Sequence, residues 1–205
     1  MGGAAGEQAS RWESRRAGGK ADMNLRGKRV AILIATGYHE HELLFPYYRL
    51  LEAEAEVVVA GPEAGATLLG EGRHGKDGLP FETTAAIGDL KADDLDAVHL
   101  PGGIWGPLTL RAHEDTRKLV REMVARGKIV GAICHAPWIL ISAGVLKGRK
   151  VACPGDMAID CENAGATYLR EKVVRDGPLV TGVYFGYLPE YMREFMRAVG
   201  GEPEA

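Results

Sequence analysis

The sequence has few cysteines, and their spacing excludes two common roles. Its 205 residues contain three, Cys134, Cys153 and Cys161, and no CxxC pair. An odd number of cysteines at irregular spacing is unsuited to a disulfide framework, and the missing CxxC pair argues against a structural zinc site. We therefore expect free thiols in a reducing, cytoplasmic compartment, where a thiol is available for chemistry.

The sequence also has no excess of basic charge and no long apolar run. With 25 basic and 28 acidic side chains, its formal net charge is −3, so we expect no nucleic-acid partner. No run of about 18 apolar residues occurs, so we expect no membrane-spanning segment. Residues 1–24 lack the apolar stretch of roughly 7–15 residues that a secretory signal contains.

Length and composition predict one domain between two tails. Residues 1–24 are rich in Gly, Ala and charge without apolar periodicity, which predicts a disordered extension. Residues 25–200 are long enough to enclose one core, and residues 201–205 form a C-terminal tail. Met23 precedes the first apolar run, so it stays open whether residues 1–22 belong to the native protein.

Apolar runs alternate with amphipathic segments along the domain. Strands are predicted at 28–35, 55–61, 96–103 and 128–133, with short ones in VVR and PLVTG; helices are predicted at 40–53, 116–127, 135–146 and 188–199; segment 62–90 is predicted to form loops with a small hairpin. This order predicts an α/β fold, a mostly parallel sheet with helices on both faces. Ligands of such sheets bind at the carboxyl ends of the strands. The most unusual residues follow three strand ends, at 35–42, 101–105 and 133–137.

Cys134 is the candidate nucleophile because it lies between a predicted strand and a helix that we expect to begin at His135. A helix N-terminus stabilises a thiolate and lowers the cysteine pKa, here to well below the free value of about 8.5. Unpaired N–H groups of the first helical turn can also stabilise an oxyanion. A small buried core thiol is the alternative interpretation.

Two further strand ends supply candidate partners. Gly102 and Gly103 permit close backbone approach, so their N–H groups are candidates for an oxyanion hole; a plain turn is the alternative. Glu42, at the start of the helix after the first strand, would shuttle a proton if it points at Cys134. Otherwise it is a solvated first-turn acid that complements the helix dipole.

His39 and His41 lie in the same turn, beside Glu40. A His-x-His pair near Glu and Cys could in principle bind a metal. Because the two rings need not face the same way, we expect neither a metal nor a cofactor.

Several motifs together resemble the ThiJ/PfpI superfamily, in particular its PfpI-like intracellular cysteine peptidase and glyoxalase-like branch. They span Lys28 to Val199 and read EL-x-x-P, LPGG, AICH-x-P, LISAGVLKGRKV and ENAGA. The resemblance implies a flavodoxin-like three-layer sandwich, related to class I glutamine amidotransferases, with Cys134 on a nucleophile elbow. It also implies catalytic roles for Glu42 and His135, oxyanion positions at Gly103 and the His135 backbone, and assembly as a homodimer or a homohexamer (a trimer of dimers).

The chain departs from the family pattern at several positions. Leu108 stands where a third carboxylate follows LPGG in the family, so a Cys-His-acid triad across subunits is incomplete unless Glu114 or Asp115 substitutes. His39 replaces a first-turn acid, YPGIKDD becomes CPGDMAIDC, and a charged stretch becomes TGVYFGYL.

These departures replace charge by aromatic or apolar groups, which predicts a pocket lined by His39, Trp105, Trp138, Tyr184 and Phe185 for an apolar or aromatic small molecule. The same rings would also suit a subunit contact. The resulting hypothesis is a cysteine-dependent hydratase, hydrolase or glyoxalase/lyase-like enzyme acting on an electrophilic carbon. The alternatives are a PfpI-type peptidase and a non-enzymatic redox sensor or stress chaperone that uses Cys134.

Overall fold

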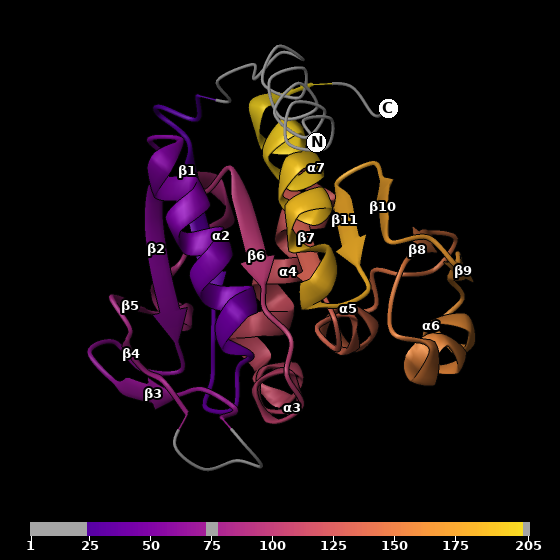
Figure 1. Cartoon of the computed structure of the whole chain (residues 1–205), viewed down its shortest axis with the longest axis horizontal. Helices are drawn as coiled ribbons and strands as arrows, with labels where there is room; N and C mark the ends of the chain where they lie inside the picture. Colours follow the sequence, from indigo (N-terminus) through magenta and orange to yellow (C-terminus); the bar gives the residue numbers. More distant parts are fainter. Residues whose placement is uncertain (1–23, 73–77, 203–205) are drawn as a thin grey trace, which may run out of the picture.

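The computed structural model describes residues 24–72 and 78–202 and is built around one seven-stranded sheet (Figure 1). Its strand order is β10-β11-β7-β6-β1-β2-β5, and only the β10–β11 pair is antiparallel. The strands span Arg29–Leu33 (β1), Glu56–Gly61 (β2), Ala85–Ala86 (β5), Ala97–Leu100 (β6), Ile129–Ile133 (β7), Val173–Asp176 (β10) and Leu179–Gly182 (β11).

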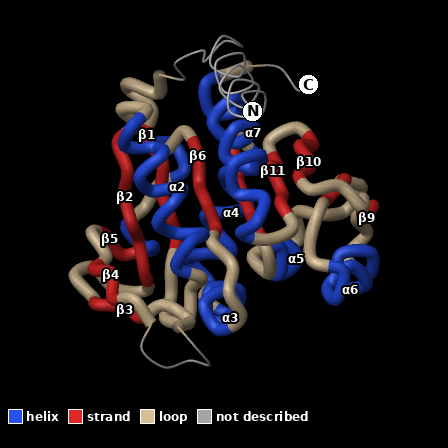
Figure 2. The backbone as a smooth tube through the Cα atoms, viewed as in Figure 1, coloured by secondary structure: helices blue, strands red, loops and turns tan. Residues whose placement is uncertain are grey.

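The central strands are nearly continuous apolar runs because helices cover both of their faces. All residues of β6 and β7 are buried, and so are four of the five in β1. Figure 2 shows helices on both sides of the strands. The helices span Glu40–Glu52 (α2), Trp105–Ala112 (α3), Glu114–Ala125 (α4), Pro137–Ala143 (α5), Ala158–Asn163 (α6) and Leu188–Gly200 (α7). The predicted three-layer, flavodoxin-like α/β fold is confirmed.

Each face of the sheet has its own apolar core. On one face, Leu43 and Leu50 of α2 and Phe195 of α7 pack against strand residues such as Ile32. On the other face, side chains of α3, α4 and α5 pack together, Met123 and Leu140 among them. In Figure 1, α2 and α7 lie side by side in front of the sheet and α4 lies behind it.

The remaining elements are short. β3 (Thr67–Leu69) and β4 (Pro80–Glu82) form the hairpin predicted within 62–90, and β8 (Lys150–Val151) pairs with β9 (Thr167–Tyr168) in a second small sheet. Single turns of 3-10 helix occur at Ile87–Asp89 (η1), Ala92–Asp94 (η2), Gly155–Met157 (η3) and Phe185–Tyr187 (η4). The sequence prediction missed β5, α3, α6 and the β8–β9 sheet. Most of the N-terminal extension, residues 1–23, lies outside the described residues.

Candidate functional site

The three unusual loops predicted from the sequence meet at one edge of the sheet. β6 lies between β1 and β7, and all three strands are parallel, so their carboxyl ends are adjacent. The loop after β1 leads into α2 and Glu42, the loop after β6 holds Gly102 and Gly103, and Cys134 follows β7 directly. The fold therefore brings the predicted nucleophile, acid and glycine pair together.

Cys134 occupies a strained turn. Its φ is +60°, a left-handed conformation that non-glycine residues rarely adopt. Its N–H donates a hydrogen bond to the Gly182 carbonyl of β11, 3.0 Å away. Helix α5 begins at Pro137, so the helix that we predicted from His135 begins two residues later. The turn therefore separates Cys134 from the helix end.

Glu42 lies beneath Cys134, fully buried. Its Oε2 accepts a hydrogen bond from the Gly102 N–H at 2.8 Å, and the Cys134 thiol lies beside the same carboxyl group. Oε1 is buried without a partner that meets hydrogen-bond geometry. A Cβ at Gly102 would lie 2.6 Å from both Cys134 Cβ and Glu42 Oε2, so only glycine fits between them.

His99 fixes the backbone of Glu42 from inside the sheet. It is fully buried in β6, with Nε2 2.8 Å from the Glu42 carbonyl and Nδ1 2.9 Å from the Tyr191 hydroxyl. Burial lowers the His99 pKa to about 4, so the ring is neutral at physiological pH. Since a carbonyl only accepts, Nε2 must donate to Glu42, and Nδ1 accepts from Tyr191.

The pKa values of the two central acids are both raised, so that at neutral pH the thiol stays protonated and the carboxyl group is close to its midpoint. Burial raises the pKa of Glu42 to about 7, although the Gly102 N–H opposes this. Burial, followed by the Glu42 charge, raises the pKa of the Cys134 thiol to about 12, while the N–H groups of Gly103 and His135 oppose the increase. The sequence-based prediction of a lowered Cys134 pKa is wrong: desolvation and a nearby carboxylate outweigh the N–H donors.

His135 connects the thiol to a carboxylate that the sequence analysis missed. Its Nδ1 lies 3.3 Å from Cys134 Sγ, and its Nε2 lies 3.2 Å from Asp156 Oδ2. Within one chain, the two substitutes considered for Leu108 lie elsewhere: Glu114 pairs with Arg117 and Arg121 on its own helix, and an Asp115 oxygen lies beside η1. Their part in a triad across subunits stays a prediction. The sequence signal for Asp156 was the altered CPGDMAIDC stretch.

Glu71 is a second missed residue. Its Oε2 lies 2.8 Å from the point that a Cβ on Gly103 would occupy. Burial and the charge of Glu40 raise its pKa, and its own charge acts on both Glu42 and Cys134. Glu71 follows the β3 strand in the weakly patterned 62–90 segment, where no motif marked it.

The predicted pocket side chains are divided between several places. The His39 ring stacks on the Phe185 ring with centroids 4.9 Å apart, and its centroid lies 5.5 Å from that of the His41 ring. The backbone N–H of Phe185 points at Glu42. The Trp138 ring packs against the His135 ring with centroids 4.9 Å apart, and Trp138 Nε1 donates a hydrogen bond to Asp160. Tyr184 packs edge-on against Phe185. Trp105, by contrast, is 63% exposed at the start of α3.

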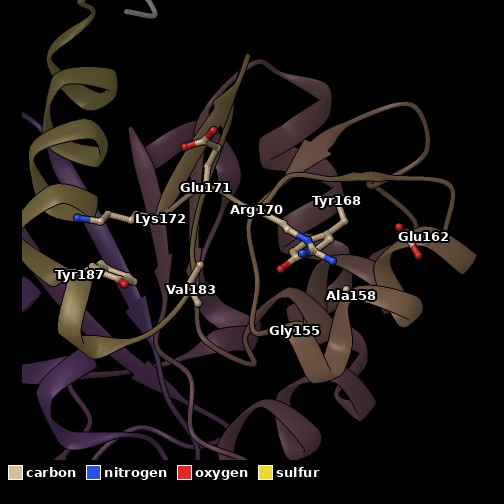
Figure 3. Close-up of a pocket in the computed structure, with 9 residues that line it drawn as sticks. All are labelled: Gly155, Ala158, Glu162, Tyr168, Arg170, Glu171, Lys172, Val183 and Tyr187. Carbon is tan, nitrogen blue, oxygen red and sulfur yellow. The ribbon is translucent and has the colours of Figure 1, made fainter.

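A cavity of about 550 Å³ lies next to this site (Figure 3). It lies between the η3–α6 segment, the loop after β9 and the η4 turn, and its lining includes Arg170, Lys172 and Tyr187 but neither Cys134 nor Glu42. Among the described residues, no cluster of three or more His, Cys, Asp or Glu side chains is arranged to hold a metal, and no helix is long and apolar enough to cross a membrane.

Comparisons with known proteins agree on one family. The DJ-1/PfpI family model matches residues 28–198. "Deglycase PfpI" of Pyrococcus furiosus is 37% identical over 169 residues, covering 82% of this chain and 98% of that protein. "Protein/nucleic acid deglycase 2" of Escherichia coli is 34% identical over 174 residues, covering 84% and 98%.

Two more relatives extend the comparison. "Putative cysteine protease YraA" of Bacillus subtilis is 34% identical over 154 residues, covering 75% of this chain and 88% of that protein. Among solved structures, Drosophila melanogaster DJ-1beta superposes with a TM-score of 0.78 at 25% identity, covering 85% of this chain and 91% of that one. A family model that spans most of the chain, together with these relatives, establishes that the protein belongs to the DJ-1/PfpI family.

Proposed function

We propose that this chain is a cysteine-dependent enzyme that acts on the electrophilic carbon of a small carbonyl compound or of its amine adduct. One observation carries the proposal: a buried carboxyl group whose pKa is about 7 lies directly beside Cys134. A group of that pKa exchanges protons readily near neutral pH, which suits it to general acid–base work. The deglycase names of two relatives fit this chemistry.

The reaction would begin from the neutral thiol. Cys134 Sγ attacks the carbonyl carbon as its proton passes to ionised Glu42 or to His135 Nδ1, 3.3 Å from the sulfur. A carbon–sulfur bond forms, the carbonyl π-bond becomes an oxyanion, and proton return gives a hemithioacetal. The Gly103 and His135 N–H groups, which already point at the sulfur, would stabilise that oxyanion. For an amine adduct, the sulfur would attack the carbon that carries the nitrogen, and the carbon–nitrogen bond would break as the carbon–sulfur bond forms. Glu42 would give the proton taken from the thiol to the nitrogen, which leaves as the free amine.

Substrate choice is proposed to depend on Phe185. Its ring is 46% exposed, stacks on His39, and belongs to the turn whose backbone faces Glu42. An apolar or aromatic group attached to the reacting carbonyl would pack against this ring. The proposed substrates are therefore α-oxoaldehydes that carry such a group, or the adducts that they form with amines.

The test compares two α-oxoaldehydes, methylglyoxal and phenylglyoxal, in wild type and in Cys134→Ser, Glu42→Gln and Phe185→Ala. Turnover should vanish in Cys134→Ser and fall by about 10²–10⁴-fold in Glu42→Gln, the usual contribution of a general acid–base group. Phe185→Ala should lower kcat/KM for phenylglyoxal more than for methylglyoxal, with Tyr48→Ala, an exposed aromatic on α2, as the matched control. Turnover that persists in Cys134→Ser would refute the proposal.

A peptidase is the second candidate, supported by the placement of His135 between Cys134 and Asp156. A Cys-His-carboxylate series is the arrangement that cysteine peptidases use to activate the thiol. Cleavage of casein or an aminomethylcoumarin peptide, lost in both Cys134→Ala and Asp156→Asn, would favour this candidate. No cleavage by a protein that turns over phenylglyoxal would exclude it.

A further inference from the structure

Cys153 and Cys161 form a buried thiol pair that the proposed chemistry does not use. Their sulfur atoms lie 3.8 Å apart, and both residues are fully buried. Because a disulfide bond is about 2.05 Å long, the sulfurs need to approach by only about 1.8 Å. These residues are also the two ends of CPGDMAIDC, the 153–161 segment, where the chain departs from the family pattern.

The 153–161 segment holds the outer contacts of His135. Asp156 Oδ2 lies 3.2 Å from His135 Nε2. Asp160 Oδ2 accepts a hydrogen bond from Trp138 Nε1 at 3.0 Å, and the Trp138 ring packs against His135. Any movement of this segment therefore changes the surroundings of the residue next to the nucleophile.

The segment also has room to move. Gly155, Ala158 and Glu162, within or next to it, form one side of the cavity of about 550 Å³, and Figure 3 shows Glu162 across that space from Lys172 and Tyr187. α6 is only six residues long, and Ile159 on its outer side is 62% exposed. Local opening of a short, partly exposed element costs less free energy than unfolding of the whole domain.

We propose that Cys153 and Cys161 are a disulfide-forming modification site, and that closing this disulfide shifts the 153–161 segment relative to His135 and Trp138. A hydroperoxide is the oxidant. One thiolate attacks the peroxide oxygen, which breaks the O–O bond and gives a sulfenic acid and, after protonation, water or an alcohol. The second sulfur then displaces hydroxide from the sulfenic sulfur and forms the S–S bond. The two thiol protons end on the oxygen products.

Formation of the bond can be tested in Cys134→Ser, which leaves only this pair of cysteines. The folded protein is treated with hydrogen peroxide, denatured, alkylated with iodoacetamide and weighed by mass spectrometry. We expect a chain two hydrogens lighter that takes up no label, whereas the untreated chain takes up two. Cys134→Ser/Cys161→Ser is the matched control and should show no such loss, and peroxide treatment of the unfolded chain in urea confirms that the oxidant is active.

The effect on the site can be followed without measuring turnover. In Cys134→Ser, the indole N–H resonance of Trp138, assigned with Trp138→Phe, should shift on oxidation and return with dithiothreitol. The resonance of Trp105, exposed on α3, should stay in place. Two labels on the treated folded chain, but none on the treated unfolded chain, would overturn the modification site. A disulfide that leaves the Trp138 resonance unmoved would overturn its coupling to His135. Neither result bears on the proposed carbonyl chemistry.

Discussion

The burial of Glu42 should make the protein less stable as pH rises. The Glu42 pKa is raised from 4.5 to about 7, chiefly by burial. Between these values the folded protein retains a proton that the unfolded chain has released. The stability that this proton provides is complete below about pH 4.5 and is lost as pH rises through about 7. At about 1.36 kcal/mol for each pKa unit, the difference amounts to about 3 kcal/mol.

Glu42→Gln should abolish this dependence. The glutamine carbonyl can still accept the hydrogen bond from Gly102, and it carries no charge to desolvate at high pH. Urea unfolding, followed by circular dichroism at intervals between about pH 4.5 and pH 8, gives the free energy of unfolding of each protein. The variant should gain about 3 kcal/mol relative to wild type across this range.

Glu82→Gln, an exposed change on β4, serves as the control for the loss of a surface carboxylate. Parallel curves for wild type and Glu42→Gln would mean that Glu42 has the same proton affinity in both states. That result would refute the buried-acid reasoning and, with it, the role proposed for Glu42 in proton transfer.

Three other groups can be tested: the thiol, the glycine beside it and the half-buried acid Asp96. Because the Glu42 charge helps to raise the Cys134 pKa, Glu42→Gln should move the midpoint of iodoacetamide labelling against pH to a lower value; an unchanged midpoint would contradict this. Gly102→Ala should lower the free energy of unfolding by about 1–3 kcal/mol, because the added Cβ overpacks the site. Gly155→Ala is the control and should be nearly neutral, because a Cβ there meets nothing within 4 Å. Equal losses of stability in thermal melts would contradict the packing argument. Burial opposes ionisation of Asp96, but the hydrogen bonds donated to its carboxylate outweigh burial and lower the pKa. Asp96→Asn should therefore lower the free energy of unfolding at neutral pH. In urea unfolding, the difference from wild type should shrink as pH falls through the acidic range.

Much of the fold could be predicted because its strands are buried on both faces. Such strands read as apolar runs, and the runs around 28–35 and 128–133 correspond to β1 and β7. The two-residue strand β5 and the six-residue helix α6 were missed because elements of that length contain less than two periods of a helical pattern and hardly one of a strand pattern.

The site was only partly predictable, for a different reason. Cys134, Glu42 and Gly102 follow strands that the parallel topology brings together, so sequence order indicated their proximity. Asp156 and Glu71 reach the site from distant loops, and no local pattern encodes that geometry. The Cys134 pKa was mispredicted because its sign depends on the balance between desolvation and N–H donors, which sequence does not give.

The left-handed backbone conformation at Cys134 means that the nucleophile lowers the stability of the fold that holds it. A non-glycine residue held at a φ of +60° costs of order 1–3 kcal/mol, and glycine would relieve that strain. A laboratory search that rewards heat resistance alone should therefore favour replacing this cysteine with glycine. Variants obtained in that way would be more stable but would lack the nucleophilic thiol. Any selection for thermostability of this protein therefore has to select for thiol reactivity at the same time.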